Sequence, residues 1–448
     1  MSASTSGPRS TGVRPVTLWV MILCSAAIAF DGFDLLVYGT VVPSLLAYET
    51  WGLTPEQVGF IGSAALVGML FGAMSVGTVS DLIGRRKVLI VCVTWFSVFT
   101  GLIAVVPTPE LFGLFRFLAG LGLGGLVPTA STLTLESVPE ERRNLYYLTM
   151  MTGYNAGGLL AALLAVPIIP ALGWRAMFVI ALLPLLLIVP LMLKFLPESV
   201  SFLLMKGRKA EAEALANRYG IALEHRTGEP TTGDGERALN PLSTMLSRNY
   251  FVGTLAFWIM AFMGLLLIYG LTTWLPQIMI ESGYALGSAL SFLVVLNIGA
   301  IVGRFFAGAA ADRFGTRLVC GLAFLAVAGC LGLLSVSLPM LLTYAIVALA
   351  GIGTFSAQDL INAHVGEYYP TNSRATALGW TLGVGRLGAI CGPVLGGLIV
   401  GAQLAVPWGF YAYALPGLLA ALIVLLLLPR SPRLATPSAR SERVEVSR

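Results

Sequence analysis

The chain has 448 residues, of which 57% are hydrophobic and only 11% are charged. A soluble fold of this size needs more polar side chains to cover its surface, so the composition favours a protein surrounded by lipid. The net charge of +5 does not indicate a nucleic-acid partner, because the basic residues lie in loops between apolar segments. The five cysteines have no metal-like or disulfide-like spacing, and we expect no metal site and no cofactor.

Residues 1–16 form a polar tail without a signal-peptide cleavage pattern, and we expect this tail to be cytoplasmic. Twelve segments follow that are apolar over about 20 residues, the length that crosses a bilayer. The sequence therefore predicts an all-α membrane protein with twelve transmembrane helices. Their approximate limits are 17–41, 57–79, 88–106, 111–134, 145–169, 174–195, 250–276, 286–310, 318–338, 340–363, 375–401 and 406–428.

Positive charges predict the orientation of these spans. Lys and Arg collect in the two termini and in alternate loops, whereas the other loops carry Glu and, apart from Arg175, no basic residue. Basic loops stay on the cytoplasmic side, so both termini are expected there. The basic loops are 80–87, 135–144, 196–249, 311–317 and 364–374.

The long cytoplasmic linker 196–249 divides the spans into two groups of six. It holds a short helical pattern from Ala210 to Tyr219, closed by Gly220, and then a polar stretch, Thr227 to Glu236, that is typical of a mobile linker. The predicted division of the chain is 1–16 (tail), 17–195 (first bundle), 196–249 (linker), 250–428 (second bundle) and 429–448 (cytoplasmic tail).

The two groups are related by an internal repeat with a fixed offset of 231 residues. Because each group has an even number of spans, both enter from the same side, and the repeat is parallel. Two such bundles around a central cavity are the architecture of a secondary transporter that rocks about a site near the bilayer midplane. The matched pairs include Gly68 with Gly299, Gly72 with Gly303, Asp81 with Asp312, Arg86 with Arg317, and Glu136 with Glu367.

The loop Gly77-Thr-Val-Ser-Asp81-Leu-Ile-Gly84-Arg85-Arg86-Lys87 and its repeat from Gly308 to Arg317 resemble the signature loop of the major facilitator superfamily. Asp31-Gly32-Phe33-Asp34 and the segment Gly383 to Ala389 are similar to patterns of its aromatic acid:proton symporters. The resemblance implies import of an aromatic acid with protons. It also implies an inner gate. The alternative is that the charges of these loops only set the orientation of the spans in the membrane. The gate residues would be Gly77, Asp81, Gly84, Arg85, Arg86, Asp312, Arg313 and Arg317. Asp81 and Asp312 are expected to lie at helix N-termini and to pair with Arg.

Charged residues inside the spans are costly in lipid and must have partners or a task. Asp31 and Asp34 share one helix face, and Arg116 lies at a similar depth, so Asp34 and Arg116 are expected to pair. We predict that Asp31, Asp34 and Arg116 couple transport to protons, with a permanent structural ion pair as the alternative. Arg386, near the midplane, is the predicted anchor for a substrate carboxylate, since a guanidinium binds a carboxylate with two hydrogen bonds. The alternative is that Arg386 is a structural partner of Asp359 or of a helix end.

Asn155 occupies the repeat position of Arg386 and is expected to supply a second central polar group. Flat apolar walls for an aromatic ring would come from a further set of residues, each of which could equally belong to the core or face lipid. The predicted wall residues are Phe33, Tyr154, Trp258, Tyr269, Phe355 and Trp380.

Asp359 is a possible partner of Arg304, and His364 is either a proton relay or a solvated residue at the membrane boundary. The sequence carries no phosphate-binding loop and no catalytic cluster, which disfavours an ATP-driven pump and an enzyme. On the basis of the resemblance, we expect a monomeric symporter in a bacterial cytoplasmic (inner) membrane that imports an aromatic monocarboxylate such as benzoate or a hydroxybenzoate. The alternative is a carrier of a non-aromatic organic acid, such as a dicarboxylate or a shikimate-like compound.

Overall fold

The computed structural model describes residues 15–138, 143–219 and 241–428, and all regular elements in these ranges are helices. Twelve helical spans in this part are long and apolar enough to cross a membrane, which confirms the predicted number. The protein is therefore a multi-pass membrane protein. The terminal tails, Gly220 and the polar stretch from Thr227 to Glu236 lie outside the described residues.

The first bundle contains six spans, of which the last is broken. The break follows from two prolines, Pro184 and Pro190, since proline lacks the N–H that continues a helical ladder. The elements are α1 (Pro15–Leu46), α2 (Pro55–Ile83), α3 (Arg85–Leu102) with η1 (Ile103–Val105), α4 (Pro109–Glu136), α5 (Arg143–Leu172), and then α6 (Arg175–Ile180), η3 (Pro184–Ile188) and α7 (Val189–Phe195).

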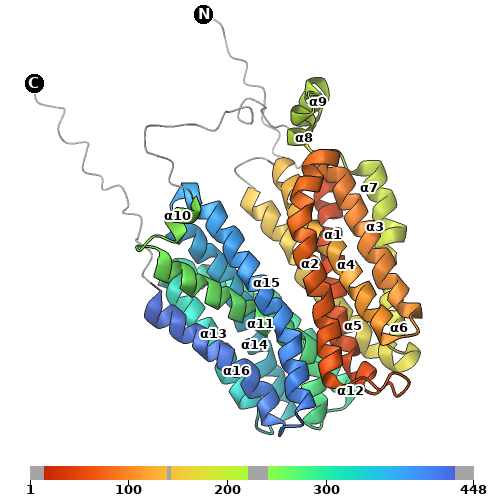
Figure 1. Ribbon diagram of the computed structural model, residues 1–448, viewed down its shortest axis with the longest axis vertical. Coiled ribbons are helices and arrows are strands. Elements are labelled where there is room, and N and C mark those ends of the chain that lie inside the picture. Colours follow the sequence, from red (N-terminus) through yellow and green to blue (C-terminus); the bar gives the residue numbers. More distant parts are fainter. Residues whose placement is uncertain (1–14, 139–142, 220–240, 429–448) are drawn as a thin grey trace, which may run out of the picture.

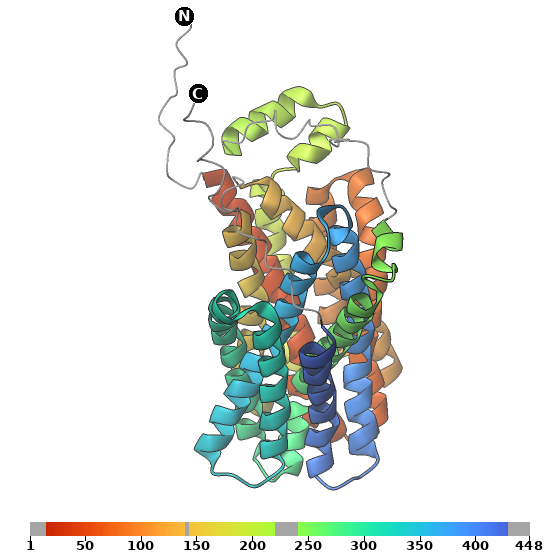
Figure 2. The ribbon, with the colours of Figure 1, turned by 90° about the vertical axis from the view of Figure 1, so that its left-hand side faces the viewer.

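The described part of the connection between the bundles holds three short helices: α8 (Val200–Met205), α9 (Lys209–Tyr219) and α10 (Pro241–Met245). The predicted linker helix is confirmed in α9. Its apolar residues, among them Leu215 and Tyr219, pack into the core of the first bundle. Figure 2 shows α8 and α9 lying across one end of that bundle.

The second bundle repeats the six-span arrangement. Its helices run past the predicted ends by as many as five residues, as at Glu281 and Tyr368, because the polar residues that flank the apolar segments continue the same helices. The elements are α11 (Phe251–Glu281), α12 (Leu286–Phe314), α13 (Thr316–Leu334), α14 (Met340–Tyr368), α15 (Thr371–Gly401), α16 (Pro407–Leu422) and η4 (Ile423–Leu427).

The repeat is visible in how helices approach one another. In the first bundle, a Cβ atom on Gly68 of α2 would overlap the backbone carbonyl of Phe117 in α4. In the second bundle, a Cβ atom on Gly299 of α12 would overlap the carbonyl of Ala348 in α14. Gly299 lies 231 residues after Gly68, and Ala348 lies 231 residues after Phe117. The repeated glycines therefore fix equivalent close helix pairs, which pack without side chains between the backbones.

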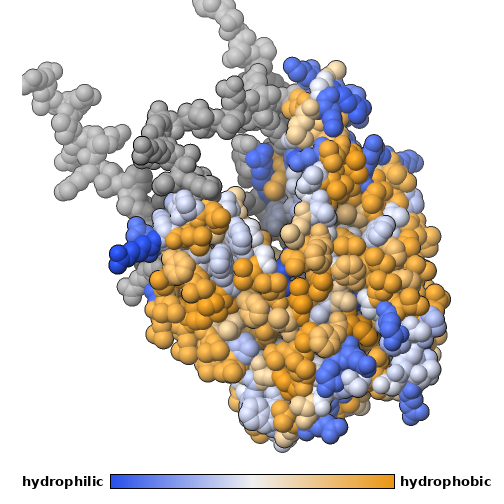
Figure 3. Space-filling model, in the orientation of Figure 1, coloured by the Kyte–Doolittle hydropathy of each residue, from blue (hydrophilic) through white to orange (hydrophobic). Residues whose placement is uncertain are grey.

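The beginning of α1 and the end of η4 lie at the same end of the molecule, which we call the termini face (Figure 1). The bundles touch in the helix halves farther from this face. There the hydroxyl of Ser63 in α2 donates to the carbonyl of Ile390 in α15 at 2.6 Å, and Gly39 of α1 lies against the backbone of Thr272 in α11. Towards the termini face the bundles diverge, and the surface between them is hollowed (Figures 1 and 3).

Close packing makes a prediction at Gly157 of α5, where a Cβ atom would overlap the carbonyl of Ala29 in α1. We expect Gly157→Ala to destabilise the protein by about 1–3 kcal/mol through overpacking. The measurement is thermal unfolding of the purified protein in detergent. Gly329→Ala is the control, since a Cβ atom there meets nothing within 4 Å and removes backbone freedom from the unfolded chain. Equal melting temperatures for the two variants would contradict the packing argument.

Candidate functional site

Asp34 and Arg116 form the buried ion pair that the sequence predicts. Nη1 of Arg116, in α4, lies 3.0 Å from Oδ2 of Asp34 in α1, and the two side chains are 1% and 0% exposed. Thr100 of α3 donates its hydroxyl to Oδ1 of the same carboxylate at 2.5 Å, and the guanidinium lies 5.2 Å from the ring centre of Tyr38. Asp34 is therefore satisfied on both oxygens, and the pair ties three helices of the first bundle together.

Asp31, one turn from Asp34, has a different environment. The residue is 0% exposed, yet neither of its carboxylate oxygens has a hydrogen-bond partner within the part of the chain that the structure describes. The charged groups that act on it electrostatically are Asp34 and Arg386 of the second bundle. A buried carboxylate without a hydrogen bond is costly when ionised, so Asp31 is the exceptional charge of the site.

Arg386 lies in α15 where this helix is pressed against α11. Gly388 faces the carbonyl of Phe262, and Gly385 would place a Cβ atom 3.0 Å from the side chain of Leu265. These glycines agree with the expected close approach of a neighbouring backbone. Arg386 itself is half-buried and lies close to the contact that Ile390, one turn further along, makes with α2. The structure thus brings the predicted carboxylate anchor to the boundary between the bundles.

Two tyrosines bridge this boundary. The hydroxyl groups of Tyr154 in α5 and Tyr269 in α11 are 3.2 Å apart, and either can donate the hydrogen bond. Asp31 acts electrostatically on both, and Arg386 acts on Tyr269. Both residues are among the predicted ring walls, but the hydroxyl contact between bundles could not be predicted from spacing within one helix.

The other predicted residues lie in several environments. Asn155 is buried, and neither polar atom of its side chain has a hydrogen-bond partner among the described residues. Phe355 is buried in a small cluster against which Tyr269 packs, and Phe33 is fully buried in the core. Trp258 and Trp380 stack on each other, with ring centres 5.7 Å apart, and Trp380 is 47% exposed.

A second ion pair joins Arg304 of α12 to Asp359 of α14 at 2.7 Å, as the sequence suggests. The side chain of Asp359 is 46% exposed although it lies within a span. Both charges act electrostatically on Tyr147 of the first bundle. An exposed ion pair at this depth fits a surface that faces water between the bundles rather than lipid. His364 is buried, with Nδ1 3.8 Å from the carboxylate of Glu367, so it is not the solvated boundary residue that was one alternative.

The signature loop organises the termini face of each bundle. Arg85 forms an ion pair with Glu136, and Glu198 accepts a hydrogen bond of 2.9 Å from the backbone N–H of Arg86 at the start of α3. Ser199 bonds both members of the Arg85–Glu136 pair. Glu198 and Ser199 follow the end of α7 in the chain, and the carboxylate of Glu198 lies at the N-terminus of α3, where negative charge is favourable.

Repeat-related arginines have equivalent partners. The guanidinium of Arg86 donates to the carbonyl of Leu193 near the end of α7, and that of Arg317 donates to Val424 in η4, at 3.1 Å for Nε. Gly84, with a φ of 99°, and Gly315, with a φ of 91°, make the tight turns before α3 and α13, a conformation that other residues rarely adopt.

One expectation for this loop needs correction. Asp81 and Asp312 were expected at helix N-termini in contact with Arg, but they lie in the last turns of α2 and α12, which extend as far as Ile83 and Phe314. Both aspartates and Arg313 are exposed, and a Cβ atom on Gly77 would meet nothing within 4 Å. Arg85 pairs with Glu136 instead, because α4 ends beside the first turn of α3.

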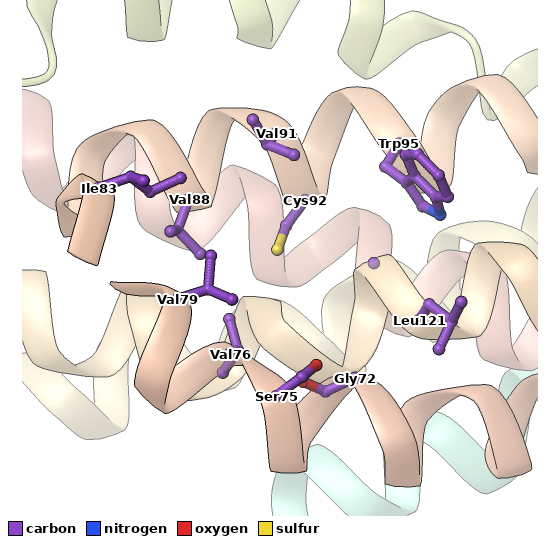
Figure 4. Close-up of a pocket in the computed structure, with 11 residues that line it drawn as sticks. Gly72, Ser75, Val76, Val79, Ile83, Val88, Val91, Cys92, Trp95 and Leu121 are labelled. Carbon is purple, nitrogen blue, oxygen red and sulfur yellow. The ribbon is translucent and has the colours of Figure 1, made fainter. Parts of the chain in front are cut away.

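The structure also contains an apolar groove on the outside of the first bundle (Figure 4). It has a volume of about 160 Å³ and lies between α2, α3 and α4. The eleven residues that line it, among them Val79, Cys92 and Trp95, carry no charge. An acid would lose its hydration there without gaining a counter-charge, so this groove is not a site for a carboxylate substrate.

The Asp34–Arg116 contact gives a prediction about stability. Asp34→Ala leaves Arg116 buried without its counter-ion, and we expect it to destabilise the protein by about 3–5 kcal/mol. Adding Arg116→Leu should restore part of that loss, because the orphaned charge is removed. Thermal unfolding in detergent measures both variants. Glu211→Ala, which breaks the exposed Arg208–Glu211 pair, is the control and should change little. A double variant no more stable than Asp34→Ala would argue against the pair.

Comparison with known proteins identifies the family. The family model of the Major Facilitator Superfamily matches residues 24–389 and 298–447. The chain is 36% identical to the benzoate transport protein of Acinetobacter baylyi (91% of this chain, 89% of the relative). It is 40% identical to the gentisate transporter of Corynebacterium glutamicum (94% and 88%) and 34% identical to the 4-hydroxybenzoate transporter PcaK of Pseudomonas aeruginosa (92% and 93%).

A solved structure supports the same fold. The crystal structure of a D-xylose-proton symporter superimposes with a TM-score of 0.74 at 18% identity, covering 93% of this chain and 98% of that one. Twelve spans in two six-helix bundles, the family match and the transporter relatives agree that this protein is a transporter and not an enzyme. The chain belongs to the major facilitator superfamily, among the relatives of its aromatic acid transporters.

Proposed function

We propose that this protein imports an aromatic monocarboxylate together with protons, by alternating access of a site between its two bundles. The observation that carries the proposal is Asp31, a fully buried carboxylate without a hydrogen bond that interacts electrostatically with Arg386 across the boundary between the bundles. An anion site and a proton site that interact in this way can couple the two cargoes.

Arg386 binds the substrate carboxylate in this proposal. Its guanidinium offers two parallel donors to a planar carboxylate. Asp31 holds the proton. When a substrate carboxylate binds Arg386, it neutralises the positive charge that offsets the negative charge of Asp31. The ionised form of Asp31 then becomes more costly. Binding of the anion therefore favours binding of a proton, and the two leave together.

Asp34 and Arg116 take a supporting part. Both oxygens of Asp34 have partners, Arg116 and Thr100, in this conformation, which supports Asp31 as the group that exchanges the proton. The alternative is that Arg116 moves away from Asp34 in the opposite conformation and leaves that carboxylate available to a proton. In both cases the proton path begins on α1.

The direction of opening follows from the proposed orientation. With basic loops on the cytoplasmic side, the termini face points into the cell, and the bundles diverge towards the cytoplasm. We assign this structure to the inward-facing state of a monomer in the bacterial inner membrane. Arg85, Arg86 and Arg317, which hold each bundle's loops together, would then meet the opposite bundle only when the inner gate closes.

Uptake measurements test the substrate class. We expect cells without other carriers to accumulate labelled benzoate or a hydroxybenzoate when they express this protein, and an uncoupler to abolish the accumulation. Shikimate and succinate are the comparison substrates. Accumulation of these acids without transport of any aromatic acid would replace the aromatic proposal by the organic-acid alternative.

A substitution at Asp31 tests the coupling. Asp31→Asn keeps the size of the side chain but cannot exchange a proton, so we expect entry down a gradient and counterflow to persist while uphill accumulation is lost. Glu49→Gln, which removes an exposed carboxylate outside the spans, is the matched control. Uncoupler-sensitive accumulation by Asp31→Asn at the rate of the control would refute the role of Asp31.

Arg386→Lys tests the carboxylate anchor. Lysine retains the charge but loses the two-pronged geometry, and we expect the half-saturating substrate concentration to rise about tenfold or more. Arg208→Lys, at an exposed position of the linker, should leave uptake unchanged. An unaltered half-saturating concentration in Arg386→Lys would place the carboxylate elsewhere.

A further inference from the structure

Several polar side chains at the boundary between the bundles have hydrogen-bond donors and acceptors that the proposed carboxylate anchor, Arg386, does not use. Tyr154 and Tyr269 make one hydrogen bond to each other, and each phenol can donate once and accept twice. The pair therefore retains one free O–H donor and several acceptor positions. Asn155, the neighbour of Tyr154 in α5, is buried with both ends of its amide unpaired among the described residues.

These groups belong to the same electrostatic neighbourhood as the anchor. Asp31 acts on the hydroxyls of Tyr154 and Tyr269, and Arg386 acts on Tyr269. Phe355 is in the hydrophobic cluster against which Tyr269 packs, so an apolar surface adjoins the polar pair. A ring held by its carboxylate at Arg386 would thus lie near hydroxyl groups as well as apolar walls.

An unsubstituted ring and a hydroxylated ring would meet this surface differently. Benzoate has no hydrogen-bonding group apart from its carboxylate, so its ring would shield the tyrosine hydroxyls from water and offer nothing in return, which costs binding. A phenolic hydroxyl both donates and accepts, and it can join the tyrosine pair as a third member. Sites built to bond a hydroxyl reject analogues that lack it far more strongly than apolar pockets reject an added methylene.

We propose that the Tyr154–Tyr269 hydroxyl pair recognises a ring hydroxyl, and that hydroxylated aromatic acids are the preferred substrates of this transporter over benzoate. This inference rests on the proposed function, since it assumes that an aromatic acid occupies the boundary between the bundles. It assigns the tyrosine pair a part in selecting the substrate that is separate from the contact it makes between the two halves.

Ligand affinities of the purified protein, measured by titration calorimetry in detergent, test the preference. The ligands are benzoate, the three monohydroxybenzoates and their three methyl ethers, which keep the ring and an oxygen but cannot donate. We expect at least one hydroxybenzoate to bind about tenfold more tightly than benzoate and than its own methyl ether. Equal affinities for benzoate and all three hydroxybenzoates would overturn the inference.

Variants then locate the recognition. In Tyr154→Phe and in Tyr269→Phe, the ratio of the two dissociation constants, benzoate over the preferred hydroxybenzoate, should fall to within about threefold of unity. The ratio is the useful quantity, because loosening the contact between the bundles changes the affinity for all ligands alike. Tyr284→Phe is the matched control, since its hydroxyl makes a similar bond to Thr343 at 3.1 Å, away from the site, and its ratio should equal that of the wild type.

The outcomes separate the inference from the proposed function. Suppose both tyrosine variants unfold at the wild-type temperature and keep the wild-type ratio of dissociation constants. The ring hydroxyl would then be recognised by another group, which would overturn the inference and leave aromatic acid transport intact. If one variant does not fold, the other variant and the wild-type ligand series still decide. Failure of well-folded wild-type protein to bind any of the seven acids would instead overturn both the inference and the proposed function.

Discussion

The cost of an ionised side chain in lipid governs the central part of this structure. Asp34 and Arg116 meet that cost together, and Thr100 completes the coordination of the carboxylate. Asp31 is buried just as deeply on the same helix but has no hydrogen bond among the described residues, and its positive neighbour belongs to the other bundle. Asp34 therefore holds helices of one bundle together, whereas Asp31 interacts electrostatically with Arg386 of the second bundle.

The two halves share their packing but differ in the centre. Gly68 and Gly299 bring equivalent helix pairs into contact, and Arg86 and Arg317 donate to carbonyls at equivalent helix ends. Within α5, however, Asn155 occupies the repeat position at which α15 has Arg386. A shared framework allows the bundles to rock against each other. In the proposed function, Arg386 of the second bundle binds the substrate carboxylate and Asp31 of the first bundle holds the proton, so the two groups lie on opposite sides of the boundary.

Much of the site could be predicted from depth along the helices. The Asp34–Arg116 pair and the Arg304–Asp359 pair follow from charges placed at similar levels of neighbouring spans, and both contacts are present. Thr100 was missed, because a single threonine inside an apolar span carries no sequence signal of its partner. The hydroxyl contact between Tyr154 and Tyr269 was missed too, since it joins different bundles. The aspartates of the signature loops were placed at helix N-termini, because sequence patterns do not reveal how far α2 and α12 extend beyond the lipid.

The sequence by itself determined the number of spans, the parallel repeat and the list of charges that the bilayer would force into contact or use. These properties follow from hydrophobic length, fixed spacing and the high cost of charge in lipid, and all three can be counted along the chain. Only the tertiary structure decided which carboxylate is saturated and which is not, and which hydroxyls meet across the boundary. Those outcomes depend on the distances between atoms of separate helices. Close packing at glycines and the relative tilt of the two bundles determine these distances.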